Sequence, residues 1–157
     1  MLASSAARGL ANVDWPGRLQ RLLPESALAR HAAPAGPVWI DGAHNPAAAE
    51  VLAAELATWP APPILIAGML RNKDYRQMLT ILAPHVDRLI AVPVPRSSAG
   101  LEPGALAAAA QELGLRATAA SDLPEAMRQA ASTGLAHPVV IAGSLYLAGA
   151  ALQLAPV

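Results

Sequence analysis

The stretch WIDGAHNPAAAE, from Trp39 to Glu50, decides the predicted fold because it passes from a strand through a polar turn into a helix. The apolar residues 38–40 indicate a short strand. Asn45 is a residue type favoured at helix N-caps, and Pro46 suits the first helical position. We therefore expect a helix over residues 46–59 and, between the two elements, a turn that holds most of the polar groups of the stretch.

The same alternation of strand, turn and helix continues to the end of the chain. The expected strands are residues 38–40, 64–67, 89–92, 116–119 and 139–142, and the expected helices are residues 46–59, 74–82, 103–113, a segment that begins at Asp122, and 145–154. Nearly continuous apolar strands between helices are typical of a mostly parallel sheet covered on both faces. We predict one Rossmann-like, three-layer α/β domain over residues 1–157, to which the first 37 residues add one or two edge strands.

Composition narrows the possible functions. The chain has 157 residues, of which 54% are hydrophobic, and a formal net charge of zero, which argues against a nucleic-acid surface. It has no cysteine, so it forms no disulfide or thiolate metal site, and no metal site is expected. Residues 129–157 carry no Asp, Glu, Lys or Arg, but Pro138 and Gly143-Ser144 interrupt them. We expect a buried strand and helix there, no membrane contact and a cytoplasmic protein.

Polar residues follow most of the predicted strands. Parallel sheets bind ligands beyond the carboxyl ends of their strands, so these residues are expected along one edge. They fall into four groups: 41–45, 68–74, 96–98 and 143–144.

The turn DGAHNP, residues 41–46, is the first of four motifs. The Asp41 carboxylate can reach a ribose hydroxyl or a cation, and the small residues beside it let a ligand approach the backbone. His44 and Asn45 precede a helix N-terminus, which favours anions. The motif therefore suits a nucleotide or a substrate carboxylate, and the alternative is a capped turn with a surface histidine.

The motif WPGRLQ, residues 15–20, places Arg18 after a Pro-Gly turn at the start of a strand. Its guanidinium could stack on a base or bind phosphate, or it could be an edge-strand arginine over a packed Trp15.

The motifs GMLRNKD and GSLYLAG, residues 68–74 and 143–149, follow two further strands. Lys73 is the only lysine of the chain and offers a compact charge, although it could be a solvated loop residue. Asp74 and Ser144 can each cap the following helix instead of contacting a substrate. The chain contains no phosphate loop and no dinucleotide fingerprint, so it lacks the usual means of holding a triphosphate alone.

In this order and spacing, the four motifs resemble the C-terminal, glutamate-ligase domain of folylpolyglutamate synthase/dihydrofolate synthase, which is shared with the Mur ligases of cell-wall synthesis. The resemblance runs from about residue 9 to the end of the chain. DGAHNP is its most specific element, and WPGR favours the folate branch over the Mur branch. Two alternatives remain: a Mur-type cell-wall amino-acid ligase domain, or a stand-alone binding module without catalysis.

The resemblance implies an ATP-dependent ligase that joins L-glutamate to dihydropteroate or a folate through an acyl phosphate. The N-terminal ATPase domain of such an enzyme carries the phosphate loop and most Mg²⁺ ligands. The C-terminal domain closes over ATP, so this chain without that partner domain is expected to be inactive. The implied roles are nucleotide binding for Arg18, Asp41 and Asn45, catalysis for His44, and glutamate binding for His44, Ser144, Lys73 and Asp74.

Overall fold

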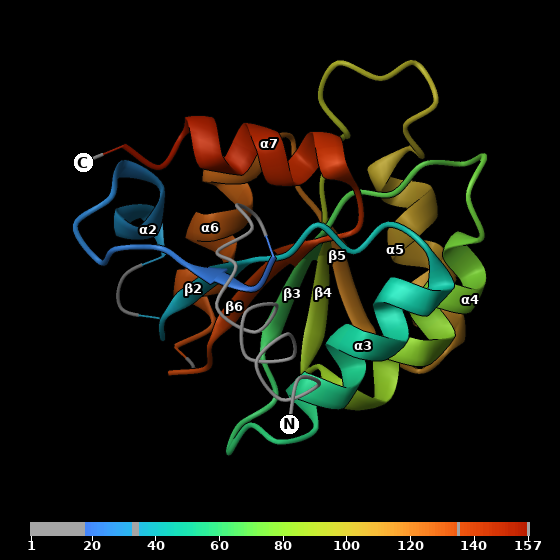
Figure 1. The fold of residues 1–157 in the computed structure, drawn as a ribbon, viewed down its shortest axis with the longest axis horizontal. Coiled ribbons are helices and arrows are strands. Elements are labelled where there is room, and N and C mark those ends of the chain that lie inside the picture. The colour runs from blue at the N-terminus through green and yellow to red at the C-terminus, as the bar shows by residue number, and fades with distance from the viewer. Residues whose placement is uncertain (1–17, 33–34, 135, 157) are drawn as a thin grey trace, which may run out of the picture.

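The computed structural model describes residues 18–32, 35–134 and 136–156. Within them, one sheet lies between two layers of helices (Figure 1). Trp15 and the Pro-Gly turn before Arg18 lie outside the described residues, so the predicted packing of Arg18 over Trp15 stays a prediction.

The strands of the described residues form a six-stranded sheet in the order β1-β2-β6-β3-β4-β5. All neighbouring strands are parallel except β1, which pairs antiparallel to β2. The strands are β1 (Gln20–Arg21), β2 (Val38–Ile40), β3 (Ile64–Ala67), β4 (Arg88–Ala91), β5 (Arg116–Ala119) and β6 (Val139–Ala142). This topology confirms the predicted mostly parallel α/β sheet.

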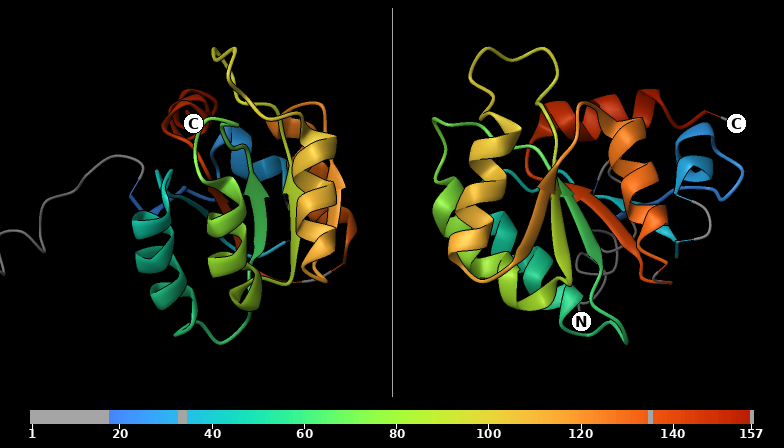
Figure 2. Two further views of the ribbon diagram at one scale, coloured as in Figure 1. Left: turned by 90° about the vertical axis from the view of Figure 1, so that its right-hand side faces the viewer. Right: turned by 180° about the vertical axis from the view of Figure 1, so that it is seen from behind.

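Helices cover both faces of the sheet, as the views in Figure 2 show. α3, α4 and α5 pack on one face, and α2, α6 and α7 pack on the other. Successive residues of β3 alternate between the two cores, which explains why the whole strand is apolar. The helices are α2 (Ala27–His31), α3 (Pro46–Leu56), α4 (Tyr75–Leu82), α5 (Pro103–Glu112), α6 (Leu123–Ser132) and α7 (Leu145–Gln153), and Ala83–His85 form a short 3-10 helix. None of these helices is long and apolar enough to cross a membrane.

Side-chain caps fix where the helices begin. Asn45 caps α3 by accepting from the Ala48 N–H at 2.8 Å, and Asp122 caps α6 in the same way, as predicted. The α3 helix ends at Leu56, three residues before the predicted end. The N-terminal part was predicted to add one or two edge strands, and β1 is such an edge strand, whereas the five-residue helix α2 was not predicted.

The free edge of the sheet at β5 is closed by side chains of its own domain. The backbone carbonyl groups of alternate residues in this strand point away from β4, and they accept hydrogen bonds from two glutamine side chains. Gln111 of α5 donates to the Ala117 carbonyl at 2.9 Å, and Gln129 of α6 donates to the Ala119 carbonyl at 3.1 Å. One glutamine comes from each helical layer, so two backbone acceptors of this exposed edge are satisfied without a partner strand.

Candidate functional site

The carboxyl ends of β2, β6 and β3 are joined into one rim. The Gly143 N–H donates to the Ala43 carbonyl at 3.0 Å, which ties the end of β6 to the turn after β2. Gly143 has φ 120°, and a Cβ atom there would lie 2.6 Å from the Gly68 carbonyl oxygen at the end of β3. Only glycine combines this backbone with such a close approach. The carboxyl ends of these strands therefore form one edge, as predicted, and the close approach of β6 to β3 requires glycine at position 143.

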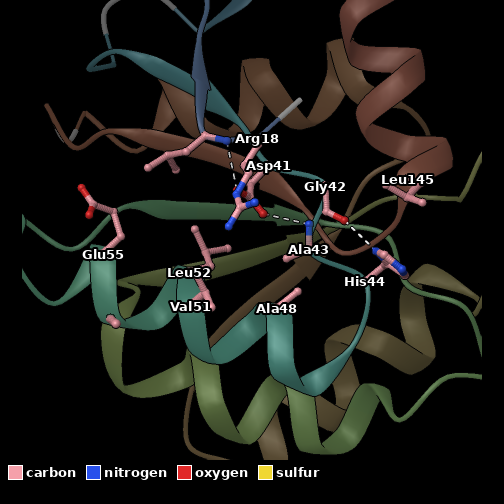
Figure 3. A pocket seen from close by; sticks show the side chains of 12 residues that line it. Arg18, Asp41, Gly42, Ala43, His44, Ala48, Val51, Leu52, Glu55 and Leu145 are labelled. Atoms are coloured by element: carbon pink, nitrogen blue, oxygen red, sulfur yellow. Dashed lines mark hydrogen bonds between the residues drawn. The ribbon is translucent and has the colours of Figure 1, made fainter. Parts of the chain in front are cut away.

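Arg18 reaches this rim because β1 runs antiparallel to β2. Gln20 lies opposite Ile40, so the residues before β1 lie beside the residues that follow β2. The Leu19 N–H donates to Oδ2 of Asp41 at 3.0 Å, and the Ala43 N–H donates to Oδ1 at 2.8 Å (Figure 3). A single carboxylate thus connects the start of β1 with the turn after β2.

A pocket of about 670 Å³ opens between this rim and α3. Its charged or polar side chains include Arg18, Asp41, His44 and Glu55 (Figure 3). The rest of its lining is mostly apolar and is contributed by Leu19 before β1, the DGAHNP turn, α3 and Leu145 at the start of α7. The pocket can therefore hold a ligand with an apolar body and charged or hydrogen-bonding groups at its margin.

Asp41 is the buried acid of the pocket, with 9% of its surface exposed. Burial raises the pKa of its carboxyl group above the ordinary value. The two backbone N–H bonds and the nearby charge of Arg18 act in the opposite direction and partly offset that rise. Asp41 therefore holds its proton more strongly than an exposed aspartate does, and its negative charge depends on these neighbours.

His44 is half-buried, and its ring is oriented by its own turn. Nδ1 lies 2.9 Å from the Gly42 carbonyl oxygen. A carbonyl can only accept, so Nδ1 carries the proton of this bond. In the neutral ring, Nε2 then holds the lone pair and can accept a hydrogen bond or a proton.

Asn45 and Ser144 lie next to pocket residues in the sequence but use their side-chain oxygens to cap helices. Asn45 caps α3, and Ser144, only 1% exposed, accepts from the Leu147 N–H of α7 at 2.9 Å. Neither is among the residues that line the pocket. The capping interpretation of Ser144 therefore accounts for the contact seen here.

Lys73 and Asp74 lie on a separate loop after β3 and do not line the pocket. Both are exposed, and Asp74 caps α4 by accepting from the Gln77 N–H at 3.2 Å. Arg71 anchors this loop, because its backbone N–H donates to the Ala99 carbonyl and its guanidinium to the Ser98 carbonyl. Of the predicted site residues, the structure thus brings Arg18, Asp41 and His44 into one pocket.

Sequence reasoning missed several residues of the pocket. Ala48, Val51, Leu52 and Glu55 all line it from α3. Their spacing of three and four residues places them on one helical face, a signal that was available in the sequence. Within the described ranges, no three acidic or histidine side chains gather in a way that could hold a metal ion.

Residues 27–145 match the family model described as Mur ligase, glutamate ligase domain. A folylpolyglutamate synthase of Lacticaseibacillus casei is 33% identical over 151 residues, covering 93% of this chain and 31% of that protein. Among solved structures, folylpolyglutamate synthase of Mycobacterium tuberculosis, complexed with ADP and AMPPCP, matches 96% of this chain and 34% of its own, with a TM-score of 0.78 and 33% identity. The bifunctional folylpolyglutamate synthase/dihydrofolate synthase of Yersinia pestis matches 96% of this chain and 34% of its own, with a TM-score of 0.68 and 28% identity.

The chain spans about a third of the length of these relatives. The family match covers most of the chain, and the fold agrees with it over nearly the whole length. The chain therefore belongs to the Mur ligase family, as a glutamate ligase domain of the folylpolyglutamate synthase type.

Proposed function

We propose that this chain is the C-terminal domain of an ATP-dependent ligase that adds L-glutamate to dihydropteroate, to reduced folates or to both, through an acyl phosphate. The observation that carries this proposal is the pocket that gathers Arg18, Asp41 and His44. It lies at the carboxyl edge of a fold whose relative from Mycobacterium tuberculosis was solved with ADP and AMPPCP. The nucleotide of that relative makes ATP the first ligand to consider here.

The residues of the pocket fit a nucleotide chemically. The guanidinium of Arg18 is exposed and suits a phosphate group, which it can bind through two N–H donors. Each oxygen of Asp41 already accepts one N–H, but an ionised carboxylate oxygen can accept a second hydrogen bond, for example from a ribose hydroxyl. The apolar part of the lining suits the uncharged part of such a ligand. We keep Asn45 in the nucleotide-binding set because it begins α3, where free N–H groups favour an anion.

L-Glutamate is assigned to His44, Ser144, Lys73 and Asp74. Nε2 of His44 can take a proton or orient the substrate, which is the basis of its proposed catalytic role. Lys73 and the Ser144 hydroxyl can each donate to a carboxylate, and Asp74 can accept from an ammonium group. Because the two caps explain Ser144 and Asp74 without a substrate, these assignments need separate tests.

Phosphoryl transfer depends more on positioning and charge stabilisation than on covalent chemistry by the protein. In this proposal, an N-terminal ATPase domain of the same enzyme supplies most Mg²⁺ ligands, and the pocket of this chain closes the nucleotide site from the other side. Closure would place Arg18 and Asp41 against the nucleotide and exclude water. The reaction consumes ATP and L-glutamate, so we expect it in the cytoplasm.

The test replaces the matching domain of Mycobacterium tuberculosis folylpolyglutamate synthase with this chain. The fusion and the isolated chain are given ATP, L-glutamate and one acceptor: dihydropteroate, tetrahydrofolate or a cell-wall precursor. Products are identified by mass spectrometry. We expect a glutamylated pterin or folate from the fusion and none from the isolated chain.

Matched variants identify the residues that matter. In the fusion, Arg18→Ala should lower kcat/KM for ATP about ten- to a hundredfold, because it removes a charge-assisted contact. His44→Ala should lower turnover as well. Arg30→Ala and His31→Ala, at exposed positions of α2, are the controls and should leave both values unchanged.

Three results would contradict the proposal. Turnover by the isolated chain would show that it carries a complete catalytic site without an N-terminal ATPase domain. Product from the cell-wall acceptor alone would favour a Mur-type ligase. A folded fusion that binds ADP but forms no product would favour a binding module.

A further inference from the structure

Leu19, next to Arg18, has an unusual backbone. Its φ is 42°, in the left-handed region that residues with a side chain rarely adopt. It lies immediately before β1, which is only two residues long. The Leu19 side chain packs at the margin of the core, but the two-residue strand gives its backbone little support, so another interaction is needed to hold the positive φ.

Asp41 provides that interaction. Its Oδ2 accepts from the Leu19 N–H at 3.0 Å across 22 residues of sequence. Its Oδ1 accepts from the Ala43 N–H at 2.8 Å, which fixes the carboxylate relative to its own turn. The carboxylate is nearly buried, and the charge of Arg18 helps to keep it ionised. The Asp41 carboxylate therefore binds the backbone directly next to Arg18, the cation of the pocket (Figure 3).

We propose that Asp41 is a positioning residue for Arg18: it holds Leu19 at positive φ and thereby sets where the guanidinium enters the pocket. Without this bond, Leu19 would relax towards a negative φ, and the chain direction at Arg18 would change. The consequence for ATP rests on the proposed function. The positioning itself is a property of the chain and can be measured without a ligand.

The first experiment measures hydrogen exchange of the Leu19 amide by NMR in the wild-type chain and in Asp41→Asn. Asparagine keeps the size of the side chain but replaces one acceptor oxygen by a donor, so it loses one of the two N–H bonds, and Asp41→Ala, which loses both, shows the full effect on Leu19. We expect the exchange of Leu19 to rise about tenfold or more, in line with the loss of a bond to a charged group. The amide of Leu65, in the centre of the sheet, reports global unfolding, and Asp122→Asn is the control for replacing an exposed capping aspartate.

The second experiment is a double-mutant cycle in the fusion described above, with ADP as the probe. Asp41→Asn and Arg18→Ala should each weaken ADP binding, by about tenfold if one charge-assisted contact is lost. Asp41 also has a proposed contact of its own with the nucleotide, so if it acts through Arg18 as well, the loss of affinity in the double variant should be smaller than the product of the two single losses. If both residues contact the nucleotide independently, the two losses should multiply.

Unchanged exchange of Leu19 in Asp41→Ala, or losses of affinity that multiply, would overturn the inference. Failure of Arg18→Ala to weaken ADP binding by the fusion would count against the proposed nucleotide site instead. In that case the exchange of Leu19 still decides whether Asp41 holds this backbone.

Discussion

Replacement of Gly143 by alanine tests the close approach on which the rim of the site depends. The new Cβ atom would lie 2.6 Å from the Gly68 carbonyl oxygen and 3.1 Å from Cγ of Met69. The methionine side chain can move, but the carbonyl belongs to the backbone at the end of β3. The variant must therefore separate the ends of β6 and β3 or distort one of them.

Two costs add up in Gly143→Ala. Holding an alanine at φ 120° costs about 1–3 kcal/mol, as for other sparsely populated backbone conformations. Forcing a methyl group against a packed carbonyl costs about 1–3 kcal/mol more. We expect the free energy of unfolding to fall by about 2–6 kcal/mol, which is a large part of the roughly 5–15 kcal/mol typical of a domain. The melting temperature should fall by at least about 4 °C.

The measurement is urea unfolding followed by circular dichroism, with Gly149→Ala as the matched control. Gly149 lies in α7, and a Cβ atom there would meet nothing within 4 Å. Alanine in a helix is more stable than glycine by about 0.5–1 kcal/mol, so this variant should be stabilised. The same substitution should thus have opposite signs at positions six residues apart. A loss below about 1 kcal/mol at Gly143 would refute the reasoning, because neither cost would then be present.

Three further predictions follow from the caps, the buried acid and the free edge of the sheet. Ser144→Ala should lower the free energy of unfolding by about 0.5–2 kcal/mol, because it removes the cap of α7. Asp122→Ala, which removes the cap of α6, should have an effect of the same size. A rise in the KM for glutamate in the fusion that occurs with Ser144→Ala alone would show a substrate role that capping does not explain. Burial raises the pKa of Asp41 above its value of 3.8 in the unfolded chain. The wild-type chain should therefore gain stability relative to Asp41→Asn below pH 3.8, and it should lose this gain as pH rises through the pKa of the folded state. A difference in the free energy of unfolding, measured in urea, that is constant with pH would contradict this. Joint replacement of Gln111 and Gln129 by alanine should expose the backbone of β5 and increase self-association. Light scattering of the double variant, compared with each single variant, measures this. An unchanged association state would show that other features protect the edge.

Most of the fold could be predicted because its strands are buried on both faces. β3 and β6 are entirely apolar, and the helices between the strands begin at polar caps such as Asn45 and Asp122. The N-terminal part was less predictable. A five-residue helix such as α2 is too short to show a periodic pattern, and only Ser26 as its N-cap marked its start. β1 has two residues and owes its place to pairing with β2.

The site was predictable where a polar residue directly follows a buried strand. Asp41 and His44 lie at the rim, as that rule predicts, whereas Lys73, which the same rule placed along this edge, lies on an exposed loop outside the pocket. The positive φ of Leu19 and the contact of Gly143 with Gly68 depend on segments far apart in the sequence. Such features arise only when the sheet is assembled, so no local pattern in the sequence predicts them.

The two sides of the pocket are held by different means, and this should separate the effects of their variants. The rim formed by β2, β6 and β3 is held by ladder bonds and by the Gly143 contact, so changes there should mainly lower stability. Arg18 precedes a two-residue strand and is held through Leu19, whose backbone is bound by the Asp41 carboxylate and whose side chain packs at the margin of the core. Because little of the core depends on that segment, loss of the Asp41 bond should weaken ligand binding more than it lowers the free energy of unfolding. A plot of ligand affinity against stability for both groups of variants should therefore show two branches, and a single common line would mean that Arg18 is as firmly built into the fold as the rim.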